Sequence, residues 1–174
     1  MALYHHVEDK AALVAVLVDA VIAERALPPP TGSWRDDLWE MARWMRETTL
    51  AHPAVARLRS KYRVWTPSIF PMTERWLSIW QQSGLELDRA LLAASASSSA
   101  VIGFVDQELV LQELTLPDDA LLSSFPNARL SFRLERDGDG EFELVVRSVI
   151  DGVHARVASG EVDAPWPATG GRRA

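Results

Sequence analysis

The chain has 174 residues, of which 48% are hydrophobic and 24% charged, and its formal net charge is −6. This ordinary globular composition predicts one domain with a single hydrophobic core, and the acidic balance argues against nucleic-acid binding by the chain as it stands. The sequence has no cysteine, which excludes disulfide frameworks, thiolate catalysis and cysteine-based zinc sites and fits a reducing cytoplasm.

The first predicted helix covers residues 10–26. Asp9 can cap it, the residues up to Ala23 are almost all apolar, and a run of three prolines ends it. A signal peptide is a poor match, because acidic residues precede the apolar run and Asp19 interrupts it. A membrane span needs about 20 apolar residues, and the run at residues 11–23 is shorter than that. The run therefore predicts a buried helix of a soluble protein with no membrane partner.

Three amphipathic helices are predicted between residues 33 and 84. Ser33 can cap the first, His52-Pro53 ends it and starts the second, Thr66-Pro67 starts the third, and Gly84 ends that one. Apolar residues recur at helical spacing in each. They are Trp34, Leu38, Met41 and Met45; Val55, Leu58 and Tyr62; and Ile69, Met72, Trp76, Ile79 and Trp80.

Two long helices are predicted in the C-terminal half, at residues 86–113 and 141–158. Small residues fill the middle of the first, which allows close approach of another helix or a ligand. Between them, residues 118–124 form a short helical turn, and a helix from Pro126 ends before a turn at 137–140. The valine-rich last segment would also suit a strand, but strand patterns are scarce elsewhere, and the predicted fold class is all-α.

Three short motifs, each followed by further residues at a set distance, occur in order along the chain. They are Leu3-Tyr4-His5-His6-Val7 with Lys10 and Asp19; Gly84-Leu85-Glu86-Leu87-Asp88-Arg89-Ala90-Leu91 with Gly103-Phe104 and Gln107-Glu108; and Asp139-Gly140-Glu141-Phe142-Glu143 with Asp151-Gly152-Val153. In this order and spacing they resemble the tetracycline-repressor (TetR) family of transcriptional regulators, and its tetracycline-repressor-type C-terminal subclass most of all. The likeness covers nearly all of residues 1–160.

The resemblance implies a helical bundle of the TetR C-terminal regulatory type, preceded by a remnant of a helix-turn-helix. Residues 1–9 would be the end of the DNA-binding domain, 10–163 the ligand-binding and dimerisation domain, and 164–174 a disordered tail. Two subunits would form a homodimer through helices 86–113 and 141–158.

The resemblance also implies DNA contacts near the start of the chain. Tyr4, His5 and His6 would lie on the recognition helix and face the major groove of operator DNA, and Lys10 would contact phosphate. Outside this motif, His5-His6 would be an ordinary polar surface pair. Effector binding would shift the helix at 10–26 and so lower the affinity for DNA.

An effector cavity is expected among the helices that carry most of the tryptophans. The residues assigned to it are Trp44, His52, Trp65, Trp76, Trp80, Ser99 and Phe104. Tryptophan at helical spacing is more often core, His52 could equally cap a helix, and the serine run around Ser99 could be a close-packing face. Tetracycline-binding members use a histidine in this stretch to hold drug-bound magnesium, and Ser99 matches it, so the effector is expected to be a small, apolar or aromatic, metal-free molecule.

No enzyme, metal site or cofactor is predicted. The chain has no Gly-x-Ser-x-Gly elbow, no spacing that pairs a serine with His52 or His154, and no glycine-rich phosphate loop. Residues 137–140 superficially resemble a calcium loop, but they lack the ligand positions and the final glutamate of an EF-hand.

The predicted function is a ligand-responsive DNA-binding regulator, expected to be a cytoplasmic repressor, that lacks most of its DNA-binding domain. The alternative is a dimeric, helical, small-molecule-binding protein without a DNA role. Three explanations for the missing N-terminal helices are open: a start assigned late at an internal methionine, a truncated gene, or a domain that works without DNA. The first two are favoured.

Overall fold

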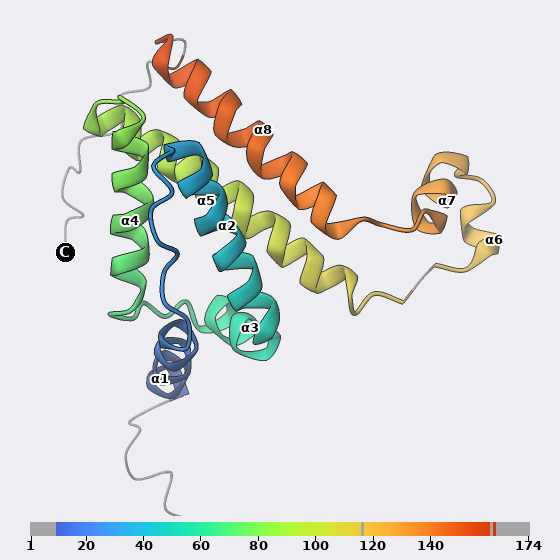
Figure 1. Ribbon diagram of the computed structural model, residues 1–174. Helices are drawn as coiled ribbons and strands as arrows, with labels where there is room; N and C mark the ends of the chain where they lie inside the picture. Colours follow the sequence, from blue (N-terminus) through green and yellow to red (C-terminus); the bar gives the residue numbers. More distant parts are fainter. Residues whose placement is uncertain (1–9, 116, 161, 163–174) are drawn as a thin grey trace, which may run out of the picture.

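All residues that the structure describes lie in α-helices or their connections. The computed structural model describes residues 10–115, 117–160 and 162, and no strand occurs in these ranges (Figure 1). The helices are α1 (Lys10–Ala23), α2 (Trp34–Ala51), α3 (Pro53–Tyr62), α4 (Ile69–Gln82), α5 (Leu87–Leu111), α6 (Asp119–Leu122), α7 (Pro126–Arg133) and α8 (Gly138–Ala158). The predicted all-α fold class is confirmed, whereas the predictions for 1–9 and 164–174 lie outside the described residues.

Side-chain caps and a glycine set several helix ends where the sequence predicted them. The Ser33 hydroxyl accepts a hydrogen bond from the backbone N–H of Asp36 at the start of α2, and Pro53 is the first residue of α3. Gly84, directly after the last turn of α4, has a φ of +90°, a conformation that glycine adopts without steric cost.

Several helix ends differ from the prediction, among them those of α1, α4 and α8. Helix α1 ends at Ala23, three residues early, and α4 begins at Ile69 rather than at Pro67. The segment before α4 is instead a tighter turn, in which the N–H groups of Ile69 and Phe70 donate to the carbonyls of Thr66 and Pro67, three residues back. Helix α8 begins at Gly138 rather than at Glu141, because the Asp137 carboxylate caps it through the N–H of Gly140.

The main hydrophobic core lies among α2, α4, α5 and α8. Leu38, Ile79, Trp80 and Phe142 are almost completely buried in it. Helix α5 packs along α8 on one side and against α4 and α2 on the other, and α5 and α8 run side by side over most of their length in Figure 1. Most of the apolar surface that the fold removes from water is therefore in this one cluster.

Two tryptophans of the main core share one buried hydroxyl. The indole N–H groups of Trp76 and Trp80 donate to Ser97 Oγ over 3.2 and 3.0 Å, and that hydroxyl donates to the carbonyl of Ala93 over 2.7 Å. Every polar atom of this group is satisfied without water. The small residues in the middle of α5 thus allow α4 to approach closely, which is the packing role expected for them.

Helix α5 is long and apolar enough in composition to cross a membrane. Its stripe of Ala90, Ala93, Ser97, Val101 and Val105 is buried against neighbouring helices of the bundle. That packing is what a helix of a soluble bundle shows, and the apolar content of α5 does not indicate a membrane protein.

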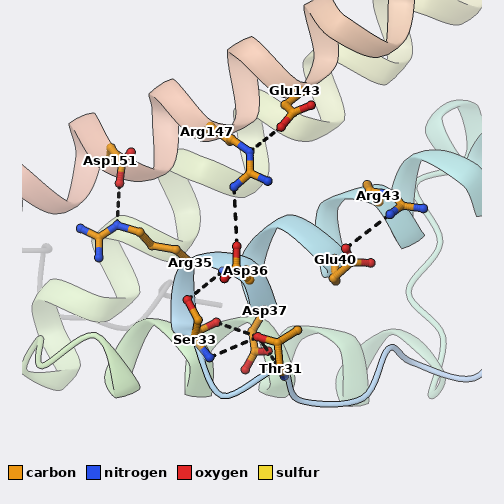
Figure 2. A network of polar contacts seen from close by, with 10 residues as sticks. All are labelled: Thr31, Ser33, Arg35, Asp36, Asp37, Glu40, Arg43, Glu143, Arg147 and Asp151. Atoms are coloured by element: carbon orange, nitrogen blue, oxygen red, sulfur yellow. Dashed lines mark hydrogen bonds and ion pairs between the residues drawn. The ribbon is translucent and has the colours of Figure 1, made fainter.

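Ion pairs join the start of α2 to α8 (Figure 2). Arg35 Nε lies 2.7 Å from the carboxylate of Asp151, and Arg147 lies 3.7 Å from that of Asp36. Exposed pairs of this kind contribute about 0–1 kcal/mol each. They orient α2 on α8, while the apolar core beneath them supplies the stability.

A second, smaller hydrophobic cluster joins α1 to the bundle. Val14 and Val18 of α1 are buried with Ile69 at the start of α4, and partly buried residues of α3 cover them. Helix α1 lies across one end of the molecule, below α2 and beside α3 (Figure 1). The helix that the sequence assigns to communication with DNA is thus attached by a small contact surface of its own.

Candidate ligand-binding cavity

The residues predicted to contact DNA lie at or beyond the edge of the described structure. Tyr4, His5 and His6 are outside the described residues. Lys10 is the first residue of α1 and is exposed. Their assignment to DNA contact stays a prediction.

A cavity of about 310 Å³ separates the two hydrophobic clusters. Val18 and Ile22 of α1 form one wall, Trp44 and Thr48 of α2 another, and Val101 of α5 closes the side of the main core. Residues of α3 and of the segment after it complete the lining. An occupant of this space would touch α1 and the main core together.

Three of the residues assigned to an effector site line this cavity. Trp44 is 6% exposed and Trp65 is 75% exposed, so one indole lies in the interior and the other at the surface. His52 lies at the junction of α2 and α3, and its Nε2 is 2.8 Å from Oε2 of Glu24, just after α1. His52 is therefore both part of the lining and a contact to the end of α1. Its side chain makes no capping hydrogen bond to α3.

The other four assigned residues do not line the cavity. Trp76 and Trp80 belong to the main core, where Ser97 binds both indole N–H groups. Ser99 is exposed on α5 and donates to the carbonyl of Ser95. Phe104 packs on Phe142, with ring centroids 5.3 Å apart. Trp76 and Trp80 belong to the apolar stripe predicted for their helix, whereas Trp44 lies beside the stripe of α2 and Trp65 lies between α3 and α4.

Sequence reasoning missed the charged and hydroxyl residues of the lining. Arg59 and Arg63 both line the cavity, and so do Thr48 and Asp106. The basic residues from 57 to 63 alternate, a pattern that spreads them around a helix. The spacing of four between Arg59 and Arg63 does put these two on one face, and that spacing is the pattern that could have indicated them.

Several polar groups of the lining have no partner in the described part of the chain. Trp44 Nε1 and Thr48 Oγ1 are buried and form no hydrogen bond. Neither Arg59 nor Arg63 forms an ion pair with a carboxylate within residues 10–115, 117–160 and 162. Buried polar groups in folded proteins are nearly always paired, so this wall of the cavity differs from the rest of the interior.

Polar contacts hold α1 beside the cavity at two points. Asp19 accepts from the N–H of Ser68 over 3.1 Å and also from its hydroxyl, and these bonds lower the pKa of the Asp19 carboxyl. Just after α1, Arg25 lies 2.7 Å from Glu47 of α2. Burial raises the pKa of Glu47, but hydrogen bonds from arginines including Arg25 outweigh it, and the pKa lies below its ordinary value.

No group of three metal-ligating side chains comes together in the part of the chain that the structure describes. The expectation of a metal-free ligand stays a prediction. The cavity itself offers aromatic and aliphatic walls with a few polar groups, the usual form of a site for a small organic molecule.

An all-α bundle with a cavity beside a terminal helix defines a class of helical regulators, and the comparisons identify its family. A family model described as the tetracyclin repressor-like C-terminal domain matches residues 27–157. The chain therefore belongs to the TetR family of transcriptional regulators. The function predicted from the sequence, a regulator of this family, is confirmed.

Known relatives agree in sequence and in structure. The chain is 34% identical over 110 residues to an HTH-type transcriptional regulator of Saccharopolyspora erythraea, an alignment that covers 63% of this chain and 47% of that protein. It is 28% identical over 160 residues to the tetracycline repressor protein class E of Escherichia coli, covering 89% and 75% of the two chains. The TetR-family protein ActR of Streptomyces coelicolor, solved with actinorhodin, superposes with a TM-score of 0.68 at 26% identity, over 89% of this chain and 80% of that one.

Proposed function

We propose that residues 10–160 form the effector-sensing and dimerising part of a TetR-type repressor, with the cavity beside α1 as its effector site. One observation carries the proposal: Val18, Val21 and Ile22 of α1 are themselves part of the lining. In the architecture that the sequence predicts, α1 leads from the DNA-binding domain. An occupant of the cavity would thus contact the connecting helix directly.

The proposed effector is a small aromatic molecule. Trp44, Trp65 and the aliphatic side chains of the lining offer flat apolar contact, and aromatic side chains supply much of the binding energy of such sites. ActR, which has the same fold, has been solved with actinorhodin. The tryptophans of the main core have no part in this proposal.

Regulation follows from differential binding to two positions of α1. In the described position Asp19 is bonded to Ser68, and Glu24 to His52. An effector that fits better when α1 has moved would break these contacts and shift the population toward the moved state. DNA affinity would fall by the same coupling factor that links the two sites.

The proposed homodimer uses the exposed faces of α5 and α8. Leu87, Leu91 and Ile102 are exposed on α5, and Leu144 is exposed on α8. A Cβ atom added at Gly152 of α8 would meet no atom within 4 Å, so the chain's own described residues leave that face open. Sedimentation velocity would show a dimer if this proposal holds, and a monomer at all concentrations would contradict it.

Operator DNA, a cytoplasmic location and the absence of enzymatic activity complete the proposal. TetR-family regulators are generally non-enzymatic, soluble cytoplasmic proteins. DNA binding is tested by gel retardation of the region upstream of the gene, with specific and salt-sensitive retardation as the expected result. A chain that binds aromatic compounds but retards no DNA would instead be a small-molecule-binding protein without a DNA role.

Tryptophan fluorescence tests the cavity. A series of planar aromatic compounds is titrated into the wild type and into Trp65→Phe and Trp39→Phe. Trp65 lines the cavity, whereas Trp39 packs on Phe142 outside it. Quenching that Trp65→Phe reduces and Trp39→Phe leaves intact supports the assignment. Quenching that both variants leave unchanged contradicts the contribution of Trp65.

A further inference from the structure

We infer that the effector of this cavity is an aromatic carboxylate, bound through Arg59 and Arg63 on the α3 side, with its ring against the apolar α2 wall. The inference rests on the proposed function, since it names the chemistry of the same site. It goes further by assigning a negative charge to the ligand.

The arginines of the cavity differ from other arginines of the described chain in having no ion pair. Ten others each lie within 4 Å of a carboxylate oxygen. They are Arg25, Arg35, Arg43, Arg46, Arg57, Arg75, Arg129, Arg133, Arg136 and Arg147. Arg59 and Arg63 are thus free to bind something that is not part of the chain.

The position of Arg59 makes its lack of an ion pair informative. Its side chain is half-buried in the lining, and Arg63, four residues later, is exposed at the same wall. Arginine is rarely buried without a partner. A planar guanidinium matches a carboxylate with two parallel hydrogen bonds, which makes this pairing stronger and more specific than one with a neutral group.

The described lining carries more positive than negative charge. Asp106 is the only carboxylate of the lining, against the two guanidinium groups of Arg59 and Arg63, and His52 already bonds to Glu24. The described lining therefore has an excess of positive charge inside a chain whose total formal charge is −6. An anionic ligand would balance that excess.

The α2 wall supplies apolar contact for the ring of such a ligand. Trp44 and Met45 of α2 line the cavity together with Trp65. Aromatic and aliphatic side chains of this kind pack against the ring of an aromatic acid.

The experiment compares acids with their neutral amides by isothermal titration calorimetry. The probes are naphthalene-2-carboxylate, anthracene-2-carboxylate and pyrene-1-carboxylate, each with the matching carboxamide, added to the full chain. For the compound that binds best, we expect the acid to bind at least about tenfold more tightly than the amide, as the loss of a charge-assisted hydrogen bond predicts. Arg59→Met should remove that preference, and Arg63→Met should reduce it.

Arg57→Met is the matched control. Arg57 lies on the same helix, pairs with Glu113 and does not line the cavity. This variant should keep the wild-type ratio of acid to amide affinity. Thermal unfolding of each variant without ligand separates a loss of binding from a loss of fold, and Arg59→Lys tests in addition whether the planar guanidinium, rather than the charge alone, is required.

The outcomes distinguish this inference from the proposed function beneath it. Equal affinity for acid and amide, or equal weakening by Arg57→Met and Arg59→Met, would overturn the carboxylate while leaving an aromatic effector in place. Binding of none of the six compounds would overturn both. A preference for the acid that depends on Arg59 but not on Arg57 supports both.

Discussion

The main core and the cavity wall lie side by side in one small bundle, and they treat polar groups in opposite ways. In the main core, Ser97 binds the N–H groups of both Trp76 and Trp80. In the cavity wall, Trp44 Nε1 and Thr48 Oγ1 are equally buried and have no partner. The same residue types are thus hydrogen-bonded in one place and left unpaired in the other.

The residues that stabilise the fold and the residues that line the cavity lie in different parts of the described chain. The main core includes fully buried side chains from α2, α4, α5 and α8, whereas α1 is attached through a cluster with three buried residues. Elements that move in regulation are drawn from the less stable parts of a protein. We therefore expect mutations in the two regions to separate into effects on unfolding and effects on binding.

The largest expected effect is that of Trp80→Ala in the main core. Trp80 is 0% exposed, and truncation of a buried tryptophan costs about 3–5 kcal/mol in the free energy of unfolding. Trp65→Ala is the control, because this indole is 75% exposed and should change stability by no more than about 0.5 kcal/mol. Urea unfolding measures both. A similar cost for the two variants would contradict the separation.

The next effect is that of Ser97→Ala, which removes the shared hydroxyl. The Trp76 indole keeps a contact to the carbonyl of Ala94, but the Trp80 indole N–H loses its only hydrogen bond in the described structure. One unsatisfied buried donor costs about 1–3 kcal/mol. Ser99→Ala, two residues further along α5, changes an exposed hydroxyl and should cost less than about 0.5 kcal/mol. If both serines prove equally replaceable, the shared hydroxyl contributes nothing to the core.

The opposite sign is expected for Thr48→Val in the cavity wall. Valine has nearly the shape of threonine and lacks the unpaired hydroxyl, so the ligand-free protein should gain about 1 kcal/mol. Thr49→Val is the neighbouring control, because the Thr49 hydroxyl already donates to the carbonyl of Met45 over 2.7 Å and its loss should give no gain. Chemical denaturation without ligand measures the gain. Destabilisation by Thr48→Val would mean that its hydroxyl is satisfied in solution.

Local patterns predicted the fold of the described residues well because they act through neighbours in sequence. Pro53 and Gly84 mark ends of helices that the structure has, and the apolar spacing from Trp34 to Met45 gives α2 its buried face. The start of α4 was missed by two residues because a tighter turn with bonds from residue i to i+3 precedes it. The bond from Ser68 to Asp19, distant in the sequence, is a contact that no local pattern indicates.

The candidate site was harder to predict, for a physical reason. Trp76 and Trp44 are both buried on helices. What separates them is the hydrogen-bond partner of the indole, which is a long-range contact from α5 for Trp76 and absent in the described residues for Trp44. The sequence did not indicate Arg59 and Arg63, because basic residues two apart spread around a helix and form no single basic face. Arg59 and Arg63 line a cavity and form no ion pair in the described residues. This arrangement depends on how α1, α2 and α5 pack around them.

The smallest effect concerns the attachment of α1 and appears as a dependence on pH. The bonds from Ser68 lower the pKa of Asp19 in the folded chain below its unfolded value of about 4. The ionised group therefore stabilises the fold at pH values above about 4, and this contribution is lost as the pH falls through the folded-state pKa. Asp19→Asn has no such titration. The difference in unfolding free energy between wild type and variant should be constant from pH 7 to about pH 5 and shrink below about pH 4.

Hydrogen exchange at pH 7 locates the same effect within the molecule. Loss of the Asp19 contact should speed exchange of the amides of α1, which is held by the small cluster, and leave those of α5 near the wild-type rates. Faster exchange throughout α5 would mean that α1 and the main core unfold as one unit. An effector bound against α1 could then not move that helix without loosening the whole bundle, and the contrast between the two regions would no longer explain regulation.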